Sequence, residues 1–135
     1  MTEAEVEIEI PFHDIDIMGV AWHGHYVKYL EIARCALLDK IDYNYSQMKE
    51  SGYAWPVIEI FIRYPQPLYF QQKVQVRAKL AEWENRLKIS YEIKDVDSGK
   101  RLTRAHTVQV ALDMQTREMM FVSPEVLFQK LGIES

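Results

Sequence analysis

The sequence predicts an α+β fold in which an antiparallel sheet of five or six strands packs around one long central helix. Residues 26–41 repeat apolar side chains at spacings of three and four, as one face of a helix does. One segment before this run and four or five after it place apolar residues at every second position, as half-buried strands do. The long helix is the only element large enough to cover the apolar face of these strands.

In chain order, residues 6–10 alternate apolar residues with glutamates and stop at Pro11, which predicts the first strand. A polar loop follows and leads into the helix. Additional apolar residues widen the helix surface beyond a stripe, which indicates a helix buried on most sides, with Cys35 packed inside it. Residues 51–56 contain Ser-Gly and a proline and predict a loop.

The second half of the chain follows a period of two. Residues 97–100, Asp-Ser-Gly-Lys, are typical of a hairpin turn. Ser123 is expected to cap a short C-terminal helix, with Pro124 at its first position and Leu131 near its end. The expected strands are residues 58–64, 74–80, 87–93, 106–112 and, as a short final one, 119–122.

The composition indicates a single soluble domain over residues 1–135. A formal net charge of -4 argues against binding to nucleic acid or to an anionic membrane surface. No apolar segment approaches the roughly 20 residues of a membrane span, and the N-terminus lacks the pattern of a signal peptide. The single cysteine excludes an internal disulfide. We therefore expect a cytoplasmic protein.

Residues 12–26, between the first strand and the helix, contain two aspartates and three histidines that could take part in catalysis or binding. The first N–H groups of a helix are free to polarise a carbonyl oxygen. A carboxylate close by, such as Asp16, can act as a base or a nucleophile. From residue chemistry alone, Asp16 is better suited to capping the loop or the start of the helix, and Asp14 is expected to be a structural hydrogen-bond acceptor.

A metal site is the other possibility for this segment. Its histidines and aspartates offer nitrogen and oxygen ligands, but their spacing matches no metal motif carried by a helix. His23 and His25 lie two apart at the start of the helix and are expected to point apart. We therefore expect no metal and no cofactor. The potential ligands are His13, Asp14, Asp16, His23 and His25.

The element order and this motif resemble the hotdog-fold thioesterases, and most closely the 4-hydroxybenzoyl-CoA thioesterase type. The resemblance covers nearly the whole chain. It rests on the acidic-x-Asp-x-x-Gly pattern of residues 14–19, on residues 23–26 at the start of the helix, and on Tyr-Pro-Gln-Pro-Leu at residues 64–68. It implies a hotdog fold and hydrolysis of an acyl-CoA thioester to a free acid and coenzyme A.

The resemblance also implies roles for individual residues. It places the catalytic carboxylate at Asp16 and the N–H that polarises the carbonyl at His23, and it makes Gly19 the residue that lets the loop turn tightly. The helix-opening tyrosine is commonly preceded by Asn, where this chain has His25, so the acyl group stays open. The residues expected to line or support the pocket are Trp22, His25 and Tyr26.

Coenzyme A carries phosphates, so a local basic cluster is expected despite the acidic total. Arg101 and Arg104, near the hairpin, and Arg63 are the candidates. The alternative is that they belong to an ordinary charged strand face.

Other functions stay open at this point. The substrate could be an acyl-carrier-protein thioester, or the protein could bind acyl-thioesters without turning them over. Hydratases that share this fold carry a different local motif, which we do not find. We also expect a homodimer, because one sheet leaves an exposed edge that a second copy can pair with. The relatives extend this expectation to a homotetramer.

Overall fold

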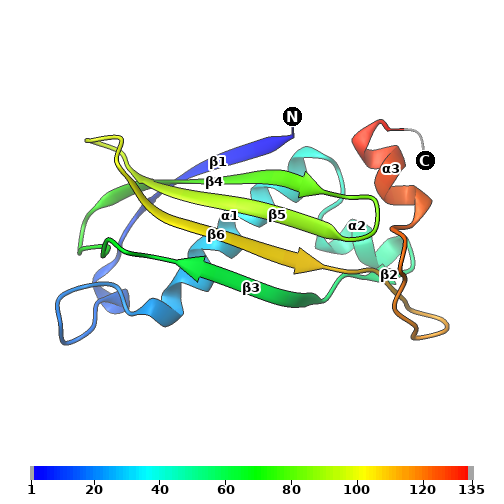
Figure 1. The fold of residues 1–135 in the computed structure, drawn as a ribbon, viewed down its shortest axis with the longest axis horizontal. Coiled ribbons are helices and arrows are strands. Elements are labelled where there is room, and N and C mark those ends of the chain that lie inside the picture. The colour runs from blue at the N-terminus through cyan, green and yellow to red at the C-terminus, as the bar shows by residue number, and fades with distance from the viewer. Residues whose placement is uncertain (1, 134–135) are drawn as a thin grey trace.

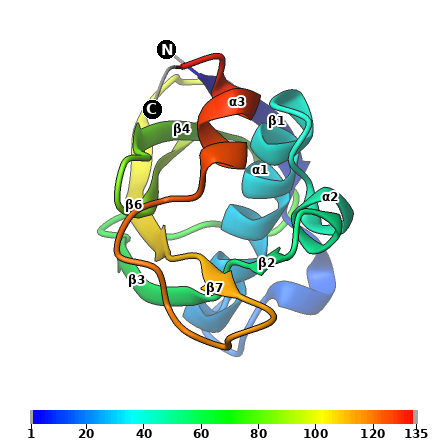
Figure 2. The ribbon, with the colours of Figure 1, turned by 90° about the vertical axis from the view of Figure 1, so that its right-hand side faces the viewer.

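The computed structural model describes residues 2–133. Strand β1 (Glu3–Glu9) leads through two 3-10 turns, η1 (Phe12–Asp14) and η2 (His23–His25), into helix α1 (Tyr26–Lys40). Figure 1 shows the large sheet in front of α1, and Figure 2 shows α1 lying against one face of that sheet. The later elements are α2 (Tyr45–Glu50), β2 (Tyr53–Ala54), β3 (Val57–Arg63), β4 (Lys73–Glu82), β5 (Leu87–Asp95), β6 (Arg101–Gln109), β7 (Leu112–Asp113) and α3 (Glu125–Leu131).

The large sheet has five strands in the order β1-β4-β5-β6-β3, and every neighbouring pair is antiparallel. Strands β2 and β7 form a separate two-stranded ribbon. The predicted α+β architecture, an antiparallel sheet on one long helix, is therefore confirmed. In this order β1 and β3 are the two edges of the sheet.

The core lies between α1 and the inner face of the sheet. Leu30, Ala33 and Leu37 of the predicted helix face are buried, as are the alternating apolar residues of β4 and β5. The helix is not buried on most sides, however. Ile32 is 45% exposed and Cys35 is exposed, because α2 and the ribbon leave that side of the helix partly open.

Strand β6 differs most from its prediction. It runs over Arg101–Gln109 and not over residues 106–112. Its inner face includes buried Thr103, Thr107 and Gln109. These polar residues concealed the alternation that marks a strand. The expected strand at residues 119–122 is also wrong, because this segment forms only one isolated bridge, between Met119 and Leu112.

The short helices were only partly predictable. Helix α2 was missed, although Asn44 and Gln47 form a capping box at its start. Helix α3 is confirmed, but its N-cap is Pro124 and not Ser123. Gly132 ends it in the left-handed conformation, with φ of 72°. No helix within residues 2–133 has the length and apolar character needed to cross a lipid bilayer.

Candidate active site

The loop between β1 and α1 contains a tight turn that begins at Asp16. The Asp16 N–H donates to the Val20 carbonyl at 2.9 Å, and the Gly19 N–H donates to the Asp16 carbonyl at 3.0 Å. Gly19 has a φ of 82°, a conformation that suits glycine and disfavours other residues. The tight turn expected of Gly19 is therefore present.

The Asp16 side chain is half-buried at this turn. Its Oδ1 accepts a hydrogen bond from the Met18 N–H at 2.8 Å, so the loop-capping role is real. This bond engages one oxygen and leaves the charge and the second oxygen available. One carboxylate can therefore cap the loop through Oδ1 and still offer its second oxygen as a base or a nucleophile.

Turn η2 presents backbone N–H groups beside this loop. The Trp22 N–H donates to the Asp14 carbonyl at 3.0 Å, and the His25 N–H donates to the Trp22 carbonyl at 2.9 Å. The N–H groups of His23 and Gly24 lie between them, at the start of a helical segment, where N–H groups have no partner from an earlier turn. The positive end of the α1 dipole strengthens the electrostatic attraction between these N–H groups and an oxygen atom.

Asp14 joins the loop to the helix. Its carboxylate is only 1% exposed and accepts hydrogen bonds from Lys28 Nζ and from the Tyr29 hydroxyl, each at 2.7 Å. His25 Nδ1 lies 3.7 Å from the same carboxylate. As predicted, Asp14 is a structural acceptor, and it fixes the Asp16 loop against the first turns of α1.

These contacts shift two pKa values in opposite directions. Burial alone raises the pKa of the Asp14 carboxyl, but the hydrogen bonds from Lys28 and Tyr29 and the nearby positive charge outweigh it, so the pKa lies below its ordinary value. Burial, and then the bond to Asp14, raise the pKa of the Tyr29 hydroxyl. Asp14 is therefore an anion and Tyr29 a neutral donor.

Aromatic rings form a wall beside η2. The Trp22 ring lies 5.3 Å from the His23 ring and 5.5 Å from the His25 ring. It also covers Gly24, where a Cβ atom would stand 2.2 Å from the indole, so only glycine leaves room for it. Tyr64, at the end of β3, stacks on His23 at 6.2 Å and contacts Tyr26 at 5.0 Å. Tyr64 was not among the expected site residues, and only its place in the Tyr-Pro segment pointed to it.

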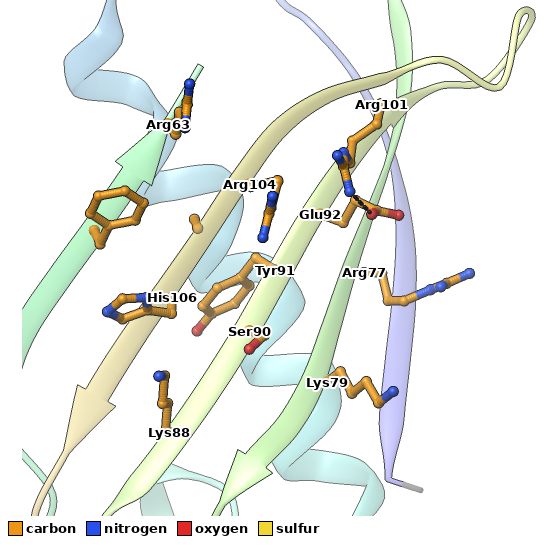
Figure 3. Close-up of a pocket in the computed structure, with 12 residues that line it drawn as sticks. Arg63, Arg77, Lys79, Lys88, Ser90, Tyr91, Glu92, Arg101, Arg104 and His106 are labelled. Carbon is orange, nitrogen blue, oxygen red and sulfur yellow. Dashed lines mark ion pairs between the residues drawn. The ribbon is translucent and has the colours of Figure 1, made fainter. Parts of the chain in front are cut away.

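The three predicted arginines, Arg63, Arg101 and Arg104, come together in a hollow of about 600 Å³ on the face of the sheet opposite α1. Figure 3 shows their side chains with Arg77, Lys79 and Lys88 over strands β3 to β6. Arg63 lies directly opposite Arg104 across β3 and β6. Glu92 is the one acidic residue among the described lining residues, and it pairs with Arg101 at 3.5 Å. Asp16 is not among the residues that line this hollow.

A second cavity, of about 800 Å³, lies between α1, α2 and the β2–β7 ribbon. Its lining is mainly apolar and includes Leu38, Met48 and Trp55. Two further lining residues, Glu31 and Arg34 of α1, form an ion pair with each other. Within residues 2–133, no three His, Cys, Asp or Glu side chains gather as they would around a metal ion.

The comparisons with known proteins show the family and the fold. Residues 10–129 match the thioesterase-like superfamily. The chain belongs to this superfamily. That match includes the Asp16 loop, η2, α1 and all the strands of the large sheet except β1.

Two curated proteins that resemble this chain are named as a thioesterase or an esterase. The Bacillus subtilis protein YneP, named as a candidate acyl-CoA thioesterase, is 31% identical over 62% of this chain. The match spans 60% of the length of YneP. A Synechocystis protein named as a candidate esterase is 26% identical over 94% of this chain and 77% of its own length.

Solved structures show the same hotdog fold. The DHNA-CoA thioesterase of Staphylococcus aureus aligns with a TM-score of 0.79 and 27% identity, over 88% of this chain and 80% of that one. A Thermus thermophilus protein aligns with a TM-score of 0.83 and 28% identity, over 96% of this chain and 97% of that one. The hotdog thioesterase fold that the motif implied is confirmed, and the superfamily match supports the expected class of enzyme, a thioester hydrolase.

Proposed function

We propose that this protein is an acyl-CoA thioesterase in which Asp16 is the catalytic carboxylate and the His23 N–H polarises the thioester carbonyl. One observation carries the proposal. The Asp16 loop and the N-terminal turn of α1 are held together through Asp14, whose carbonyl binds the Trp22 N–H and whose carboxylate binds Lys28 and Tyr29. A carboxylate and a helix N-terminus are thereby tied to each other through one shared anchor, Asp14.

Hydrolysis can proceed by two routes that use the same groups. In one, an Asp16 oxygen attacks the carbonyl carbon, the C–S bond breaks, the thiolate leaves, and water then hydrolyses the mixed anhydride. In the other, Asp16 takes a proton from water while the water oxygen attacks the carbon, and the thiolate leaves as before. In both, the carbonyl oxygen gains negative charge facing the His23 N–H and the helix dipole. The products are an acid and a thiol.

The surrounding residues complete the proposed site. Gly19 sets the turn that carries Asp16. The rings of Trp22 and His25 provide a surface on which the pantetheine arm can lie, and Tyr26, which is buried, supports this region through its contact with Tyr64. The phosphates of coenzyme A would bind Arg63, Arg101 and Arg104, which share one basic hollow. The names of YneP and of the Staphylococcus aureus enzyme support a coenzyme A thioester as the substrate.

We also propose a homodimer, with a homotetramer as the assembly of two dimers. Strand β3 is an edge of the sheet, and Ile58, Ile60 and Phe61 on it are 53%, 45% and 51% exposed. An exposed apolar edge strand is suited to pairing with a second copy.

The test is thiol release from a panel of acyl-CoAs by wild type and by Asp16→Asn. Asparagine can still accept the Met18 N–H but carries no charge, so it keeps the loop cap and removes the base or nucleophile. We expect kcat/KM to fall by about 100-fold or more. Asp113→Asn is the matched control, because Asp113 also caps a turn, through the Gln115 N–H at 2.8 Å, and should keep full activity.

Three outcomes would count against the proposal. Full activity of Asp16→Asn would mean that another carboxylate acts, with Glu31 on α1 the next to test. No thiol release from any acyl-CoA, together with release from acyl-carrier-protein thioesters, would indicate a carrier-protein thioesterase. Binding without release from either class would indicate a non-catalytic acyl-thioester-binding protein.

A further inference from the structure

The basic hollow on the face of the sheet opposite α1 is centred on one short side chain, Ser90 of the middle strand β5. The cross-strand neighbours of Ser90 are His106 on β6 and Lys79 on β4. Lys88 and Glu92 lie two positions before and after it, on the same face of β5, because side chains alternate between the faces of a strand. All four neighbours are larger than Ser90, so the hollow of about 600 Å³ opens above this residue (Figure 3).

One wall of this hollow is aromatic. The rings of Phe61 and His106 stand beside each other on β3 and β6, with their centroids 5.3 Å apart and their planes 16° from parallel. His106 Nε2 lies 2.8 Å from a carboxylate oxygen of Glu59, and this hydrogen bond fixes the orientation of the imidazole. Phe61 is the neighbour of His106 on one side, whereas the short Ser90 is its neighbour on the other. The open side of His106 is therefore a surface on which a flat ring can stack.

Most of the cationic side chains around the hollow have no anionic partner. Arg77 and Arg101 each pair with a glutamate. The other four cationic lining residues form no ion pair within residues 2–133, and these are Arg63, Lys79, Lys88 and Arg104. The chain as a whole carries a formal net charge of -4, so this excess of positive charge is local. Like charges that face one hollow repel each other, and a ligand with several negative charges would stabilise them.

Unpaired cations beside a stacking surface are complementary to a nucleotide. Arginine and lysine bind phosphate through charge-assisted hydrogen bonds, and nucleic-acid bases stack on aromatic side chains. A simple anion would use the cations but not the aromatic wall, and an uncharged aromatic ligand would use the wall but not the cations. Coenzyme A carries both groups, because it ends in adenosine 3′,5′-bisphosphate, which a diphosphate joins to the pantetheine arm.

We propose that this hollow is the subsite for the nucleotide of coenzyme A, that the adenine ring stacks on His106 above Ser90, and that these two residues determine selectivity for the base. The assignment to coenzyme A rests on the thioesterase function proposed above. Arg104 lies two positions from His106 along β6, with Arg63 opposite it on β3, so the phosphates of a stacked nucleotide meet these arginines. The volume of the hollow lies in the range of small-molecule sites.

The hollow and the proposed catalytic turn meet at one end of β3. Arg63, the last residue of β3, lines the hollow, and the next residue is Tyr64, whose ring stacks on that of His23 at 6.2 Å. Successive side chains of a strand point to opposite faces, so these two neighbours connect the basic face of the sheet with η2. A pantetheine arm that passes around this end of β3 would join a nucleotide in the hollow to a thioester at η2.

The experiment compares the binding of adenosine 3′,5′-bisphosphate and of pyrophosphate to the wild-type protein by isothermal titration calorimetry. The two ligands carry similar negative charge, but only the first has a base. We expect the nucleotide to bind about tenfold or more tightly than pyrophosphate, because the base adds its stacking on His106. Equal Kd values would identify a general anion site and would overturn the proposal, as would a lack of nucleotide binding.

Substitutions then locate the base. Ser90→Leu fills the space above β5 without removing a charge, and His106→Gln removes the ring but keeps a donor for Glu59, so each should bring the ratio of the two Kd values close to one. His106→Phe keeps a ring and should keep most of the preference. Gln75→Leu is the control, because Gln75 lies on the same face of β4 as Lys79 but does not line the hollow. A preference that survives both Ser90→Leu and His106→Gln would overturn the assignment of these residues.

Inhibition kinetics separates this proposal from the thioesterase proposal. Adenosine 3′,5′-bisphosphate should compete with an acyl-CoA for the enzyme, and binding without competition would overturn the assignment of the hollow to coenzyme A. If the nucleotide binds with the expected preference but no thioester is hydrolysed, the proposed function fails and the nucleotide site stands. If an acyl-CoA is hydrolysed but the nucleotide neither binds nor inhibits, the nucleotide site fails and the function stands.

Discussion

Asp14 and Asp16 are two residues apart in one loop, yet the fold gives their carboxylates different surroundings. Asp14 is 1% exposed and is bound by Lys28 Nζ and the Tyr29 hydroxyl. Asp16 is half-buried and accepts one N–H through a single oxygen. A carboxylate whose hydrogen-bonding capacity is used by neighbours supports structure, whereas one with a free oxygen can react. In the proposed function, the acidic-x-Asp pattern thus combines an anchor, Asp14, with the reacting carboxylate, Asp16.

The anchoring role of Asp14 predicts a specific dependence of stability on pH. Its pKa in the folded protein is lower than the ordinary 3.8, so the charged form is favoured by folding. This contribution is fully present above the ordinary pKa and is lost as the pH falls through the lower folded-state pKa. We expect Asp14→Asn to be less stable by about 2 kcal/mol at neutral pH, because two charge-assisted hydrogen bonds are weakened.

Urea unfolding of wild type and Asp14→Asn, followed by circular dichroism from neutral pH down to the acid range, checks this prediction. The difference in unfolding free energy should be constant near neutrality and should shrink below the ordinary pKa of aspartate. Asp97→Asn, on the exposed hairpin turn, should follow wild type throughout. A difference that does not change with pH would show that the Asp14 charge is not what stabilises the loop.

At the scale of elements, sequence patterns located those parts of the fold in which one face is uniformly apolar. Strands β4 and β5 and the buried face of α1 have this property, and their positions were predictable. Strand β6 was misplaced because Thr103, Thr107 and Gln109 occupy its inner face. The buried amide of Gln109 is tolerated within the strand because its Nε2 donates to the Trp55 carbonyl at 2.8 Å.

The candidate site was predictable where it depends on local sequence and unpredictable where it depends on packing between distant segments. The loop with Asp16 and Gly19 and the N–H groups of η2 follow from one short stretch of chain. Tyr64 reaches His23 only because β3 ends beside η2, and the second cavity needs α2, which the sequence reading missed.

The basic face of the sheet, on the side opposite α1, should distinguish thioesters of coenzyme A from thioesters of smaller thiols. Arg63 and Arg104 lie opposite each other on β3 and β6, and like charges in such a pair repel unless an anion lies between them. We expect Arg63→Gln combined with Arg104→Gln to raise KM for an acyl-CoA by about fivefold, as for the loss of an exposed ion pair. KM for the same acyl group on pantetheine, which lacks the nucleotide, should not change.

Steady-state kinetics with the two thioesters provides the measurement. Arg117→Gln, which removes one positive charge from an exposed turn elsewhere, should leave both KM values as they are. Equal effects of the double substitution on both thioesters would show that these arginines do not contact the nucleotide.

At the scale of the whole molecule, the edge of the sheet at β3 predicts the oligomeric state. Replacing Ile58 and Ile60 together with lysine places like charges on both copies at the proposed interface, so we expect a monomer. Val96→Lys is the matched control, since Val96 is also an exposed apolar residue, at 40%, but lies at the β5–β6 hairpin. Analytical ultracentrifugation should give a dimer or tetramer for wild type and the control. A monomeric wild type would contradict the proposal directly.

The strand order also determines the sequence of events as the chain is synthesised. Strands β4, β5 and β6 are consecutive and pair with their neighbours through short connections, so they can form a sheet early. Strand β1 pairs with β4, with Glu3 opposite Lys79, so the first strand to leave the ribosome waits for more than 70 further residues before its partner exists. Until then its alternating glutamates keep the unpaired strand hydrated. Once β4 has been made, its edge stays open to other chains until β1 pairs with it.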